Sequence, residues 1–109
     1  MNKIKIKEVF EGSILFNNGS VLGYDYLQDC CENNYADFKQ VDDIALEQTF
    51  TLPLDFEKTD CGFMFGNKPH KMFFIPCYSE QNGYYSSTVD IYFDDKKVLE
   101  GVDGVIIEK

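Results

Sequence analysis

The sequence predicts an α+β fold that is mainly antiparallel β-sheet built from hairpins, with one short amphipathic helix at about residues 38–48. Three observations lead to this prediction. Several stretches alternate apolar and polar residues, which is the pattern of strands with one buried face. Two Asn-Gly pairs lie between such stretches, and Asn-Gly is typical of tight hairpin turns. Apolar residues at three- and four-residue spacing mark residues 38–48 as the helix.

The length of 109 residues fits one domain, residues 1–109. With 44% hydrophobic and 16% aromatic residues, the chain can bury a core without a metal or a disulfide. No apolar run approaches the roughly 20 residues that cross a bilayer. Residues 1–7 alternate charged and apolar side chains, whereas a signal peptide has a continuous apolar stretch. We therefore expect a cytoplasmic protein.

The first half of the chain is expected to begin with a strand over residues 3–10, where charged and apolar residues alternate. Residues 13–16 and 20–26 then lie on either side of Asn17-Asn18-Gly19. Asn and Gly accept the positive φ angles of a type I′ turn, so these two stretches are expected to pair as a hairpin.

The predicted helix has its apolar residues on one face: Phe38, Val41, Ile44 and Ala45. Asp37 is placed to cap its N-terminus, and Gln40 follows three residues later, as in a capping box. The opposite face carries Asp42, Asp43 and Glu47.

The second half of the chain is expected to be extended over residues 49–56 and then to form strands at 61–65, 72–79, 84–93, 98–100 and 105–107. Residues 72–79 and 84–93 lie on either side of Asn82-Gly83, so we expect a second hairpin there. Pro76 has no N–H for a strand ladder, which predicts a bulge or a sheet edge at that position.

The net charge of −9 is concentrated in residues 25–60, which hold ten Asp and Glu residues against two Lys. The chain has no arginine, so the bidentate contacts of arginine with phosphate and guanine are missing. Direct binding of nucleic acid is therefore not expected, because it requires clustered cations. An acidic surface formed by Asp37, Asp42, Asp43 and Glu47 could instead meet a basic protein partner, or could simply keep the protein soluble.

The four cysteines do not form a Cys-x-x-Cys zinc motif: Cys30, Cys31, Cys61 and Cys77. A zinc site would need the fold to gather them with His70, the single histidine, and packing as free cysteines is the simpler interpretation. A catalytic thiol would need a lowered pKa and would have only His70 as a base. The sequence therefore predicts no catalytic residues, no metal, no cofactor and no enzyme activity.

Tyrosines gather near the cysteine pair and the second Asn-Gly turn: Tyr24, Tyr26, Tyr35, Tyr78, Tyr84, Tyr85 and Tyr92. Tyrosine supplies contact area and a hydroxyl group at low entropic cost, which suits a binding surface. The alternative is that they form cross-strand pairs and part of the core.

Two motifs resemble those of a known family. Residues 26–32 read Tyr-Leu-Gln-Asp-Cys-Cys-Glu, and residues 79–86 read Ser-Glu-Gln-Asn-Gly-Tyr-Tyr-Ser. They resemble, in the same order, two segments of a small domain family of unknown function found in phages and bacteria. Members of that family often have a histidine or another polar residue where this chain has Tyr26-Leu27.

The resemblance implies a phage or mobile-element setting and indicates that the two motifs lie together. We expect them to form one surface or shallow pocket with these candidate binding residues: Asp29, Cys30, Cys31, Glu32, Tyr35, Asn82, Gly83, Tyr84, Tyr85 and Ser86.

The sequence thus favours a small acidic, non-enzymatic interaction protein that binds a host protein through its acidic surface. An inhibitor of a nucleic-acid-handling or defence protein, of the anti-CRISPR or anti-restriction type, fits this description. The alternative is a small-ligand or metal-binding domain that uses the Cys30-Cys31 segment and the Asn82–Tyr85 hairpin.

Overall fold

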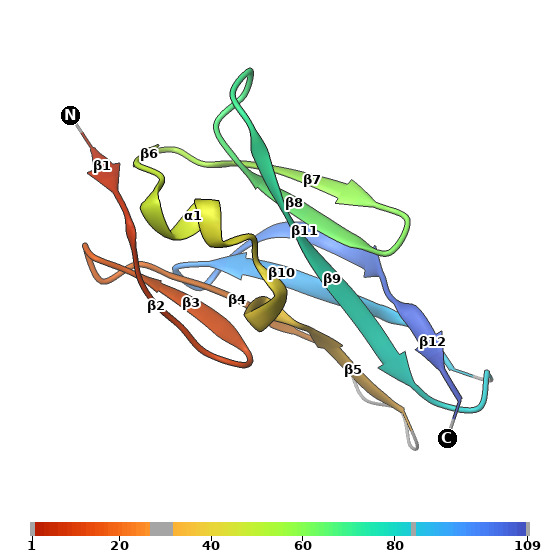
Figure 1. Cartoon of the computed structure of the whole chain (residues 1–109). Coiled ribbons are helices and arrows are strands. Elements are labelled where there is room, and N and C mark those ends of the chain that lie inside the picture. The colour runs from red at the N-terminus through yellow and green to blue at the C-terminus, as the bar shows by residue number, and fades with distance from the viewer. Residues whose placement is uncertain (1, 27–31, 84, 109) are drawn as a thin grey trace.

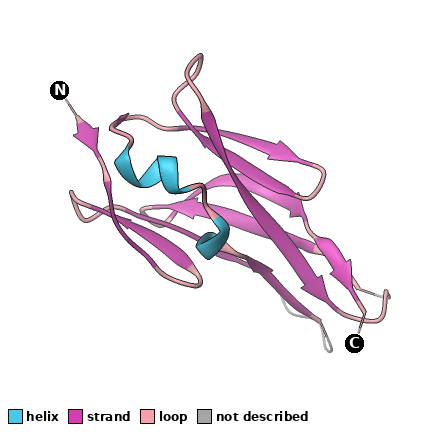
Figure 2. Cartoon of the chain, in the orientation of Figure 1, coloured by secondary structure: helices cyan, strands magenta, loops and turns pink. Residues whose placement is uncertain are grey.

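The computed structural model describes residues 2–26, 32–83 and 85–108. In chain order the strands are β1 (Lys3–Ile4), β2 (Ile6–Val9), β3 (Ser13–Phe16), β4 (Val21–Asp25), β5 (Asn33–Ala36), β6 (Phe50–Thr51), β7 (Asp55–Thr59), β8 (Gly62–Gly66), β9 (Met72–Glu80), β10 (Thr88–Phe93), β11 (Lys96–Asp103) and β12 (Val105–Ile107). The helical elements in these residues are the 3₁₀ turn η1 (Phe38–Gln40) and the short helix α1 (Asp43–Glu47). Figure 2 shows that strands dominate. The predicted predominance of antiparallel β-sheet is confirmed, but the helical content is small, so the fold is mainly β and the predicted α+β class is corrected.

Two five-stranded sheets form the body of the molecule. The first has the strand order β11-β10-β4-β3-β2, and the second has the order β12-β9-β8-β7, with β5 paired to β9. The short strands β1 and β6 pair separately. The pairing is antiparallel except between β12 and β9, which run parallel. In Figure 1 the long strand β9 crosses in front of β10 and β11, and β5, β9 and β12 extend together towards the C-terminal end.

The first predicted hairpin is confirmed. Strands β3 and β4 pair antiparallel, with Leu15 opposite Val21. The Phe16 N–H donates to the Ser20 carbonyl at 2.9 Å, which closes the turn. Gly19 has a φ of 92°, a conformation that glycine adopts without strain.

The second predicted hairpin is wrong. Strand β9 pairs with β5, β8 and β12 in the second sheet, whereas β10 pairs with β4 and β11 in the first. The Asn82-Gly83 pair does form a bend, and Gly83 has a φ of 94°. This bend carries the chain from one sheet to the other. Asn82-Gly83 therefore predicted the change of direction correctly, but not that β9 and β10 would pair.

The predicted helix over residues 38–48 is divided into two pieces. Asp37 accepts a hydrogen bond from the Lys39 N–H at the start of η1, and η1 ends at Val41, which has an extended backbone. Asp42 then caps α1 by accepting from the Ile44 N–H. An aspartate that bonds the backbone two residues ahead favours a cap over a helix interior, so Asp42 starts a new helix.

The two pieces also differ in side-chain placement from the predicted amphipathic helix. Phe38, Val41 and Ala45 are buried as expected, but Ile44 is 53% exposed. Gln40 donates to the Asp37 carboxylate at 2.8 Å instead of bonding the Asp37 N–H, so the predicted capping box does not form.

Pro76 marks the position where β9 changes partners. Its carbonyl accepts from the Asp37 N–H at 2.9 Å, but proline has no N–H to return that bond. The ladder with β5 therefore ends at Cys77, and the ladder with β8 begins at Gly62 opposite Pro76. These two pairings show no bulge at Pro76. Over Met72–Pro76 the described strands pair with β9 on one side only, through β8, so the predicted sheet edge is the alternative that forms.

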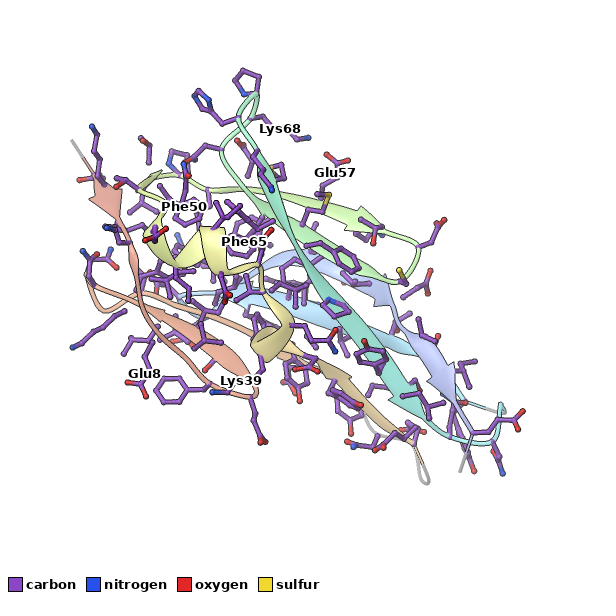
Figure 3. All side chains as sticks on the ribbon, viewed as in Figure 1. Glu8, Lys39, Phe50, Glu57, Phe65 and Lys68 are labelled. Carbon is purple, nitrogen blue, oxygen red and sulfur yellow. The ribbon has the colours of Figure 1, made fainter. Side chains whose placement is uncertain are left out.

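Aromatic side chains fill the space between the sheets. Phe50 is 1% exposed, and its ring centroid lies 6.2 Å from that of Phe16, 5.6 Å from Phe65 and 5.8 Å from Phe73. Phe16 belongs to the first sheet and Phe65 and Phe73 to the second, so Phe50 joins the two. Figure 3 shows Phe50 and Phe65 in this interior. Among the described residues, no helix is long and apolar enough to cross a membrane.

We expect Phe50→Ala to lower the free energy of unfolding by about 3–5 kcal/mol, because it leaves a cavity between the two sheets. Phe10→Ala is the matched control, since Phe10 is 43% exposed. Its change should stay within about 0.5 kcal/mol. Urea denaturation followed by circular dichroism measures both, and equal effects would contradict this description of the core.

Candidate interaction site

A buried polar cluster joins β5, β9 and the segment that precedes β10. The Ser79 hydroxyl donates to the Asn34 side-chain oxygen, and the Gln81 amide donates to the Ser79 hydroxyl at 2.6 Å. The exposed fractions are 2% for Asn34 and 0% for Ser79 and Gln81. These polar groups are satisfied by one another, which removes most of the cost of burying them.

The same cluster bonds the second motif to residues that follow the first. The Asn34 amide donates to the Ser86 carbonyl at 3.0 Å and to the Thr88 carbonyl at 3.2 Å. Gln81 donates to the Ser86 carbonyl at 3.1 Å and accepts from the Tyr85 N–H at 2.7 Å. Residues that follow the Cys-Cys motif are therefore bonded directly to the Ser-Glu-Gln-Asn-Gly-Tyr-Tyr-Ser motif.

The predicted binding residues occupy different environments. Glu32 is buried, with 3% of its surface exposed, whereas Asn82, Gly83 and Ser86 are exposed. Tyr35 and Tyr85 are partly buried. The other predicted binding residues lie outside the described part of the chain: Asp29, Cys30, Cys31 and Tyr84. The ligand-binding alternative built on the cysteine pair depends mainly on those residues.

Sequence reasoning missed the role of Asn34, Ser79 and Gln81. Asn34 alternates with the buried Ala36 and Phe38, so a period of two would have placed it on the inner face. A polar residue at such a position needs a buried partner, and this was the available signal. The partner of Asn34 is set by the pairing of β5 with β9, and the sequence patterns did not predict that pairing.

Two tyrosines form a pair on the other face of the same strands. Tyr35 and Tyr78 lie directly opposite each other, and their ring centroids are 5.5 Å apart. Gln40 donates to the Tyr78 hydroxyl at 3.0 Å. Burial raises the pKa of Tyr35, with smaller contributions from the negative charges of Glu80 and Asp37. The Tyr35 hydroxyl is therefore neutral at physiological pH and can donate or accept hydrogen bonds.

The acidic surface lies between β5 and β6. Asp42, Asp43 and Glu47 are exposed, and Asp37 is partly exposed. Asp37 and Asp42 each cap a helical element, so their carboxylates are held in place. Lys71 lies 3.6 Å from Asp42, and this exposed ion pair only partly offsets the local negative charge.

The described cysteines are Cys61, which is partly exposed, and Cys77, which is buried. Cys77 is fully buried, and burial raises its pKa to about 12, with a smaller contribution from Cys61. A thiol of that pKa is protonated at neutral pH and is a poor nucleophile. Within residues 2–26, 32–83 and 85–108, no group of three or more His, Cys, Asp or Glu residues is arranged to hold a metal ion.

A hollow of about 390 Å³ lies beside the tyrosine pair, lined by Glu11, Gly12, Tyr24, Asn33, Tyr35 and Glu80. Burial raises the pKa of Tyr24, and the neighbouring Tyr26 raises it further by a smaller amount. The Asn33 amide donates to Glu80 at 2.9 Å across the strands. Polar groups at its rim are thus paired with each other.

Comparison with protein-family models, curated proteins and solved structures finds no match for this chain.

Asn34→Ala should lower the free energy of unfolding by about 1–3 kcal/mol, because it removes a partner of Ser79 and of the Ser86 carbonyl in a buried site. Asn33→Ala is the control, since Asn33 is exposed and bonds Glu80 at the surface. It should change stability by less than about 0.5 kcal/mol. Chemical denaturation of both variants decides the matter: an equal or larger loss for Asn33→Ala would contradict the assigned role.

Cys77 should resist alkylation in the folded protein. At pH 9 an ordinary thiol with a pKa of 9.0 is half ionised, but Cys77, with a pKa of about 12, stays protonated. We expect iodoacetamide to modify the partly exposed Cys61 and to leave Cys77 intact until urea is added. Peptide mass mapping measures both rates. Labelling of Cys77 at the same rate with and without urea would show that its thiol is not buried.

Proposed function

We propose that this chain is a small acidic, non-enzymatic interaction protein of phage or mobile-element origin. It binds a basic host protein through its acidic surface and acts as an inhibitor. A nucleic-acid-handling or defence protein, as in anti-CRISPR or anti-restriction inhibition, has the basic groove that such a surface would occupy. The resemblance of the two motifs to a phage and bacterial family supports the origin.

The observation that carries the proposal is the arrangement of the acidic surface. Four carboxylates lie within residues 37–47, and three of them are exposed. Backbone caps at Asp37 and Asp42 order this segment before any partner arrives, which lowers the entropic cost of binding.

Electrostatics explains what such a surface can do. Rows of carboxylates attract the Lys and Arg residues that normally hold phosphates, and complementary charge speeds association and selects the partner. The total charge of −9 and the absence of arginine add to this preference for a basic partner.

Neutralising the acidic surface should abolish most of the binding. The variant combines Asp37→Asn, Asp42→Asn, Asp43→Asn and Glu47→Gln, and Asn retains the capping ability of Asp. A tagged protein is first used to capture partners from a bacterial host lysate at increasing salt. We then expect the purified partner to bind the variant at least about tenfold more weakly at low salt, with less salt dependence.

The control removes the same amount of charge elsewhere, at exposed acids outside the acidic surface: Asp25→Asn, Asp60→Asn, Asp95→Asn and Glu100→Gln. This control should bind within about threefold of the natural protein, because distant exposed charges are screened. Binding that survives neutralisation of the acidic surface, or falls equally in the control, would refute the electrostatic proposal.

A further inference from the structure

The outer side of the second sheet presents a row of apolar side chains. Tyr35 is opposite Tyr78, and Tyr78 is opposite Val105 on its other edge. Along β9, side chains at alternate positions share a face, so Phe74 lies on the same side as Tyr78. We call this surface the outer β9 face and define it by Tyr35, Met64, Phe74, Tyr78, Val105 and Ile107.

The outer β9 face is exposed although the opposite face is core. Phe74, Val105 and Ile107 are 37%, 46% and 38% exposed. Phe73 and Ile75, at the intervening positions of β9, are 2% and 0% exposed. Side chains of this type on an open sheet face are characteristic of the centre of a protein interface, where Tyr, Phe and Met are enriched.

Carboxylates border this face: Asp37, Asp42, Asp55, Glu57 and Glu80. Glu57 is in register with Met64, and Glu80 is in register with Ile107. Asp42 and Phe74 line the same hollow, of about 380 Å³, together with Lys71. The border is thus in contact with the apolar row.

The border keeps uncompensated negative charge. Lys68 pairs with Glu57 at 2.7 Å, as Figure 3 illustrates, and Lys71 pairs with Asp42 at 3.6 Å. In the described part of the chain, Asp37, Asp55 and Glu80 form no ion pair. A partner surface with an apolar centre surrounded by Lys or Arg would bury the apolar row and pair with the carboxylates of its border.

We propose that the outer β9 face docks a protein segment that has aliphatic or aromatic residues flanked by lysine or arginine. The inference rests on the proposed function, since Asp37 and Asp42 belong both to the acidic surface and to the border. A second copy of the chain is a poor occupant, because it would bring five carboxylates against five and leave the same charges unpaired.

The test uses three synthetic peptides of equal length. The first alternates lysine with isoleucine and tyrosine, the second replaces the apolar residues by serine, and the third replaces lysine by glutamate. Fluorescence anisotropy measures the affinity of each, and amide chemical shifts of the labelled protein locate the contact. We expect the first peptide to bind best, with the largest shifts at Phe74, Tyr78 and Val105.

The matching variant is Val105→Ser with Ile107→Ser, which removes two exposed side chains from the face. It should bind the first peptide about tenfold more weakly, as loss of two partly buried aliphatic contacts predicts. The control is Phe10→Ser with Val21→Ser. Phe10 directly follows β2 and Val21 lies in β4, both in the first sheet region, and they are 43% and 41% exposed. This control should leave the affinity unchanged, and matching unfolding midpoints confirm that both variants fold.

The other outcomes distinguish the two proposals. Equal binding of the lysine-serine peptide, lost only when the acidic surface is neutralised, would refute the apolar docking face and leave the acidic interaction standing. Equal or better binding of the glutamate peptide would overturn the acidic proposal and the border together. Dimerisation through this face in sedimentation analysis, or shifts confined to other surfaces, would overturn the docking proposal alone.

Discussion

The side-chain alternation of β9 is the constraint on which the rest of the structure depends. Its inner positions give Phe73 and Ile75 to the core and Ser79 to the buried polar cluster, whereas its outer positions give Phe74 and Tyr78 to the surface. A shift of one residue would bury the outer set and expose the core set. The register between β9 and its neighbouring strands therefore has to be fixed. The Ser79–Asn34 hydrogen bond specifies β5, and the missing N–H of Pro76 ends that ladder and confines it to the second half of β9.

The charge of the chain and its β architecture act together at the proposed site. Asp37 follows β5 directly, and its backbone N–H bonds the Pro76 carbonyl while its carboxylate starts η1. The acidic segment is consequently attached to the strand that forms the outer β9 face. An aromatic and aliphatic row that continues into ordered carboxylates is suited to a partner with both apolar and basic residues, and less suited to a nucleic acid, whose phosphates it would repel.

The sequence predicted those features that depend on neighbouring residues. The Asn17-Asn18-Gly19 hairpin was predicted because both its turn and its strands are local. The Asn82-Gly83 bend was also found, but its hairpin was not, since local turn chemistry does not say which strand pairs next. The length of the helix was overestimated because Ile44 matched the apolar period. Asp42, two residues earlier, was the stronger signal, since aspartate favours a helix cap over a helix interior. The polar cluster and the outer β9 face depend on pairings between separate segments, such as Asn34 with Ser79 and Tyr78 with Val105, and no pattern within a single segment contains that information.

Docking of a basic and apolar protein segment on the outer β9 face is tested most directly by photo-cross-linking of the full chain in a bacterial host lysate. A photoreactive amino acid replaces Val105 on the outer β9 face in one protein and Val21 on the other sheet in a second. The docking proposal predicts cross-links from position 105 to a protein segment with apolar residues beside Lys or Arg, and these cross-links should decline as salt is raised. Equal cross-linking from both positions, or contact with an acidic segment at any salt, would contradict it.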